Sequence, residues 1–175
     1  MSSLKGFIPT LGKIIGMTPD ALYERQRMLV RAGLLDAGEG RGPGSGVRAT
    51  PETVALLLIA VLASEGLADV ERRVGAIAQA RVMTPEPCEL TGKRRFGEAL
   101  AELFDRPSLA GLRVLVSRTS LRAEIEGLSF DGKAVASVFA GKSAGEPAIG
   151  VSAVLLAGAL GKITKALEEV RGDQS

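Results

Sequence analysis

The sequence contains no histidine and no tryptophan, and its one cysteine is Cys88. These absences exclude a disulfide within the chain and any zinc site built from cysteine and histidine ligands. A lone thiol also points to a reducing compartment. Aromatic residues make up only 3% of the 175 residues, which argues against a surface that stacks the bases of single-stranded nucleic acid.

The sequence also lacks long apolar segments. The longest run, residues 54–63, is about half the length that a membrane-spanning helix needs. The first residues, MSSLKGFIPTLGK, carry no apolar core of the kind found in secretory signals. We therefore expect a soluble, cytoplasmic protein with no membrane partner. Its 46% of hydrophobic residues can form the core of one domain or of two small ones.

The sequence contains no complete pattern of catalytic residues. The segment GKSAGE at 141–146 resembles part of a phosphate-binding loop, but Ala136 stands where that motif requires glycine. Cys88 has no histidine that could activate it as a nucleophile. Glu124 and Glu126 alternate with apolar residues, as the exposed positions of a strand do. We expect no enzyme activity, no cofactor and no metal site.

Helix signals are clear in the first half of the chain. Two Thr-Pro pairs, at 18–19 and 50–51, each supply an N-cap residue followed by proline at the first helical position. They predict helices over 19–32 and from 51 to about 64. The second helix is apolar nearly all round, so we expect it to be buried or to lie at a subunit interface. Helical spacing predicts a further helix over 67–82.

Residues 83–95 combine two prolines with mixed charge and predict a linker. The linker would join two domains, at 1–82 and 96–175. The fold class expected is mainly α with a small β component, and the second domain is expected to mediate self-association.

The second domain is predicted to be a helix, a three-stranded meander and a second helix. The first helix begins at Phe96, and the strands are RVLVS, RAEIEG and AVASVF. Asp131 and Gly132 form a hairpin turn signal between the second and third strands. The last helix is predicted as one long element over 148–170.

Residues 5–65 resemble the winged helix-turn-helix DNA-binding proteins of the bacterial and phage regulator type. The resemblance is carried by LGKIIGMTPDALYERQRMLVRAGLL and by the glycine-rich tract GEGRGPGSG that follows it. The tract would form the tip of a β wing, which can approach phosphates or a minor groove closely because it bears so few side chains. The segments implied are 10–15 for the support helix, 16–18 for the turn, 19–32 for the recognition helix, and 34–36 and 47–49 for the wing strands.

The resemblance also implies which residues meet DNA, because the N-terminal turns of a recognition helix enter the major groove. Leu22 and Leu29 are taken to face inward, and Arg25 is placed opposite them, within reach of a guanine edge. The residues nominated for base edges are Ala21, Glu24 and Arg25, with Arg27 or Met28 added according to the tilt of the helix in the groove. Those nominated for phosphates are Lys13, Thr18, Arg31, Arg41 and Arg48.

The charge distribution agrees with this placement. The first 50 residues hold seven basic and four acidic residues, a larger positive excess than the net +2 of the whole chain. The function expected is therefore a sequence-specific double-stranded DNA-binding protein, a dimeric regulator of transcription in a bacterium or phage. Two alternatives stay open: an oligomeric DNA-packaging subunit of the small-terminase type, and a winged-helix module that binds another protein.

Overall fold

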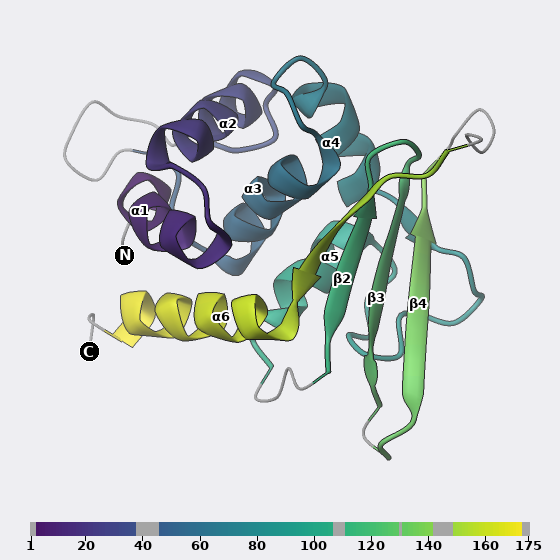
Figure 1. Cartoon of the computed structure of the whole chain (residues 1–175). Helices are drawn as coiled ribbons and strands as arrows, with labels where there is room; N and C mark the ends of the chain where they lie inside the picture. The colour runs from purple at the N-terminus through teal and green to yellow at the C-terminus, as the bar shows by residue number, and fades with distance from the viewer. Residues whose placement is uncertain (1–2, 38–45, 107–110, 130, 142–148, 173–175) are drawn as a thin grey trace.

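The computed structural model describes residues 3–37, 46–106, 111–129, 131–141 and 149–172. These residues form a mixed α+β fold, in which helices pack against an antiparallel sheet of five strands (Figure 1). The helices are α1 (Leu4–Ile15), α2 (Pro19–Arg31), α3 (Pro51–Ala63), α4 (Val70–Ala78), α5 (Phe96–Leu103) and α6 (Ala157–Gly172). The strands are β1 (Arg81–Val82), β2 (Arg113–Ser117), β3 (Arg122–Leu128), β4 (Ala134–Ala140) and β5 (Ser152–Leu156).

Side-chain caps fix the starts of the first three helices. The Thr18 hydroxyl accepts a hydrogen bond from the Ala21 N–H, and Thr50 forms a reciprocal capping box with Thr53. Both Thr-Pro start signals are thus confirmed. α1 begins earlier than the predicted support helix, because the Ser3 side chain caps it at the Gly6 N–H.

α3 is the central helix of the fold. It packs against α2, α4, α5, β2 and β5, and most of its residues are buried. This position explains its composition, because a helix covered on every side carries apolar residues all round. The prediction that this helix is buried is confirmed. None of the helices among the described residues is long and apolar enough to cross a membrane.

The middle of the chain differs from the prediction. The helix expected over 67–82 spans only α4, and residues 81–82 form β1, which pairs with β4. Within 83–95, expected to be a linker, Cys88 and Leu90 are buried, and the Cys88 N–H donates to the Lys93 carbonyl. Both belong to the single hydrophobic core that runs through the two predicted domains.

The meander of β2, β3 and β4 is confirmed, with Gly132 at a φ of 79° in the hairpin turn. The long helix predicted over 148–170 is wrong in its first part, because residues 152–156 form β5 and pair with β2. Pairing with the edge of β2 satisfies this apolar segment better than helix continuation, a tertiary effect that local pattern does not report. The resulting strand order is β1-β4-β3-β2-β5.

The two faces of the sheet have different surroundings. Val114, Val116, Ile125 and Phe139 lie on one face and are fully buried. The alternate residues of the same strands, such as Glu124, are half-buried or exposed. The sheet therefore contributes one face to the core and leaves the other open.

Candidate nucleic-acid interface

A three-residue turn joins α1 to α2. Gly16 ends α1 in the left-handed region with a φ of 73°, and the Met17 N–H donates to the Gly12 carbonyl over 2.9 Å. A Cβ atom on Gly12 would lie 2.6 Å from the Met17 carbonyl oxygen, closer than real Cβ contacts. Gly12 is therefore required for this close turn, which leaves the N-terminal end of α2 at the surface.

α2 presents one charged stripe to solvent. Asp20, Glu24, Arg27 and Arg31 follow one another at spacings of four, three and four residues, which places them on one side of a helix. Asp20, Arg27 and Arg31 are exposed, and Glu24 is half-buried. The Arg27 guanidinium contacts the Glu24 carboxylate at 2.9 Å. The acidic residues precede the basic ones, an order that also suits the dipole of the helix.

The residues nominated for DNA contact fall into four groups. Lys13, Thr18, Arg27, Arg31 and Arg48 are exposed, whereas Ala21, Glu24 and Met28 are half-buried. Arg41 lies outside the residues that the structure describes. The remaining nominee, Arg25, is buried.

The placement of Arg25 opposite Leu22 and Leu29 is wrong. Arg25 comes three residues after Leu22 and four before Leu29, so helix geometry puts all three on the same side. Arg25 is only 8% exposed. Its guanidinium donates to the Ala21 carbonyl at 3.1 Å and to the Glu65 carbonyl at 3.2 Å. It is therefore not available to a guanine edge.

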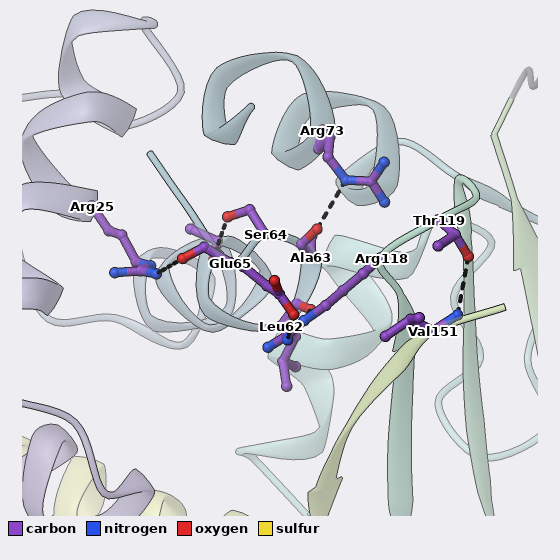
Figure 2. A network of polar contacts seen from close by, with 10 residues as sticks. Arg25, Leu62, Ala63, Ser64, Glu65, Arg73, Arg118, Thr119 and Val151 are labelled. Carbon is purple, nitrogen blue, oxygen red and sulfur yellow. Dashed lines mark hydrogen bonds and ion pairs between the residues drawn. The ribbon is translucent and has the colours of Figure 1, made fainter. Parts of the chain in front are cut away.

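Arg25 belongs instead to a group of three arginines around the C-terminal end of α3 (Figure 2). The Arg73 Nε donates to the Ala63 carbonyl at 2.9 Å, and the Arg118 Nε donates to the Leu62 carbonyl at 3.2 Å. The last carbonyls of a helix have no partner within it, and α3 has no basic residue in its own last turn. Arg73 of α4 and Arg118 of the β2–β3 loop supply two of the missing donors, and Arg25 of α2 donates to the Glu65 carbonyl just beyond the helix.

The electrostatics of this group follow from its packing. Burial lowers the pKa of Arg25, and the positive charge of Arg118 lowers it further. Burial also lowers the pKa of Arg73. The negative charge of Asp69 raises that pKa, and the positive charge of Arg72 lowers it. Arg73 additionally donates to two carbonyls of the β2–β3 loop, those of Ser117 and Ser120. The guanidinium groups are thus occupied by main-chain carbonyls.

A hollow of about 310 Å³ lies beside this arginine group, lined in part by Ser64, Glu65, Arg73, Arg118 and Thr119. Because the hydrogen bonds of Arg73 and Arg118 go to main-chain carbonyls and to Glu65, we assign the group a structural role. In the part of the chain that the structure describes, no three acidic, cysteine or histidine side chains gather as a metal site would require.

Arg73 and Arg118 were not singled out in the sequence. The one signal for them is the apolar helix that ends at Ala63 with no basic residue in its last turn, since its final carbonyls must find donors elsewhere. That signal predicts that donors exist and says nothing about where in the chain they come from.

The predicted wing strands are not formed among the described residues. The Leu34 and Leu35 N–H groups both donate to the Leu29 carbonyl, so the chain folds back onto the end of α2. On the other side, the Val47 carbonyl accepts from the Leu4 N–H, and Arg48 forms an isolated bridge with Ser3. Val47 and Arg48 therefore pair with the start of the chain's first helix, while the predicted tip lies largely outside the described residues.

Comparison of the chain with protein-family models, with curated proteins and with solved structures found no match. The candidate interface consequently consists of what the sequence and the geometry provide: α1, the turn at 16–18, and the charged stripe of α2.

Proposed function

We propose that the protein binds double-stranded DNA through the exposed surface of α1, the turn at 16–18 and α2, and that it regulates transcription as a dimer. The observation that carries this proposal is the short turn, which leaves the N-terminal end of α2 and its charged stripe accessible. This arrangement suits a helix that enters a major groove with its first turns.

The burial of Arg25 changes which residues would contact the bases. Glu24 and Arg27 remain accessible, and glutamate and arginine are the side chains that pair with cytosine N4 and with guanine. Their mutual ion pair is exposed, with about half of each side chain accessible, so its loss on binding costs little. Lys13 in the last turn of α1 and Arg31 in the last turn of α2 are also exposed and would contact phosphates.

The test begins with selection of bound duplexes from a random pool at a stated salt concentration. Arg27→Ala should then raise the Kd for the selected duplex by about 5- to 150-fold, the equivalent of ~1–3 kcal/mol for one good base contact. On an unrelated duplex the same variant should lose much less, because phosphate contacts supply most non-specific affinity. Fluorescence anisotropy measures both.

Arg72→Ala is the matched control. Arg72 is an exposed arginine on α4 that pairs with Asp69 three residues before it, as Arg27 pairs with Glu24. This variant should leave both affinities unchanged. If no duplex can be selected, or if the Arg27 and Arg72 variants behave alike, the surface does not read DNA and a role in binding another protein becomes the better hypothesis.

A further inference from the structure

The two edges of the sheet are protected to different degrees. On one side, β1 pairs only with the last two residues of β4 and is itself bridged to Arg95. The rest of β4 is uncovered on that side, but its exposed side chains, Ala134 and Ala136, are small and offer little apolar surface to a partner strand. β5 forms the other edge with five residues, SAVLL, none of them charged and none proline or glycine. An edge strand of this kind is a template for pairing with another strand.

Two of the three exposed side chains of β5 are large and apolar, and the third is Ser152. Val154 is 47% exposed and Leu156 is 59% exposed, and both lie on the open face of the sheet. Val151 and Ile149, which immediately precede β5, are also exposed. Large apolar side chains gathered at one edge indicate a surface that another molecule covers in the functional protein.

The backbone of β5 has a defined orientation. The Arg118 N–H donates to the Val151 carbonyl at 2.7 Å, next to the Ser117–Ser152 pair of the ladder. Along an antiparallel strand, the main-chain N–H and C=O groups of successive residues point alternately toward the partner strand and away from it. Ser152, Val154 and Leu156 therefore turn their N–H groups away from β2, toward the free edge.

Self-pairing suits this edge because it meets no electrostatic penalty. A second β5 aligned antiparallel about Val154 places Val154 opposite Val154 and Ser152 opposite Leu156, with no like charges facing each other. Val154 is paired with Leu115 of β2 within each copy. The alignment therefore continues an apolar row, from Leu115 through the two Val154 side chains to the second Leu115.

We propose that two copies of this chain associate through their β5 strands, antiparallel about Val154, to form one continuous sheet. This interface would form the dimer of the proposed function, but it requires neither DNA nor α2, so it can fail or hold separately from the DNA contact.

Charge substitution at Val154 tests both the partner and the register. Val154→Lys alone and Val154→Glu alone should each weaken self-association at least about tenfold, because the alignment sets like charges directly opposite each other. An equimolar mixture of the two variants should recover association through opposite charges. Sedimentation velocity of the full-length chains over a dilution series measures each case, and circular dichroism checks that each variant is folded.

Ala136→Lys is the control, because Ala136 is exposed on the same open face but in β4, which β3 and β2 separate from β5. It should self-associate as the unaltered chain does. The proposal is overturned if the unaltered chain is monomeric throughout the dilution series, if both Val154 variants remain dimeric, or if the mixture associates no better than either variant. A monomer would leave β5 free for a strand of a different protein.

Discussion

At Arg25, a charged side chain connects two helices. The guanidinium donates to the Ala21 carbonyl of its own helix and to the Glu65 carbonyl just beyond α3. Its Nε atom is buried without a hydrogen-bond partner. Burial of a charge is costly unless hydrogen bonds offset it, so these two carbonyl contacts are what make the position tolerable. The residue thus acts in stability rather than in recognition.

We predict that Arg25→Met lowers the free energy of unfolding by about 1–3 kcal/mol, the usual range for losing hydrogen bonds from a buried charged group. Methionine keeps an apolar stem, so the comparison isolates the guanidinium. Arg27→Met, two residues away on the exposed stripe, should change the same quantity by no more than about 0.5 kcal/mol. Urea unfolding measures both, and equal effects would contradict the burial of Arg25.

Among the elements, the α1–α2 turn needs a residue without a side chain at Gly12. The Cβ atom of an alanine at position 12 would collide with the Met17 carbonyl oxygen, a backbone atom that can move only if the turn opens. The same substitution at Gly161, within α6, meets no atom within 4 Å. The two glycines lie in helices, and only the first is needed for close approach.

Gly12→Ala should therefore destabilise the protein by about 1–3 kcal/mol, as overpacking of a tight contact does. Gly161→Ala should instead stabilise it by up to about 1 kcal/mol, since alanine is the better helix former. Thermal unfolding of the two variants beside the unaltered chain gives the comparison. A shift of the same sign in both would mean that the Gly12 contact does not constrain the turn.

How well each element could be predicted depends on whether its signals are local. α2 and α3 begin where the Thr-Pro pairs predict, because a cap and its proline act within one helical turn. β5 was predicted as helix, since only the neighbouring strand β2 decides its conformation. The wing strands were also misplaced, because the contact between the Leu4 N–H and the Val47 carbonyl joins segments far apart in sequence.

The candidate site shows the same division. The exposure of Lys13, Arg27 and Arg31 follows from helical spacing and was predictable. The role of Arg25 depends on a carbonyl 40 residues away, and those of Arg73 and Arg118 depend on the end of a different helix. Long-range partners of this kind leave no pattern in a single sequence.

In the whole molecule, α3 joins the two predicted halves, because elements of both pack against it. It packs on α2 and α4 from the first half and on α5, β2 and β5 from the second. Leu57, Leu58 and Ile59 are fully buried within this shared core. The first half alone would expose part of the most apolar helix in the chain. This exposure would reduce the free energy of unfolding by roughly 25 cal/mol for each Å² of apolar surface left uncovered.

We therefore predict that the chain unfolds in one cooperative transition and that a fragment of residues 1–82 does not fold by itself. In the intact chain, the calorimetric enthalpy of unfolding should equal the van't Hoff enthalpy, as it does for a two-state domain. The fragment should show no sigmoidal thermal transition by circular dichroism, because it lacks α5 and the sheet that cover α3. A fragment that melts cooperatively, or an intact chain that melts in two steps, would show that the two halves are separate folding units and that contacts across α3 contribute little to stability.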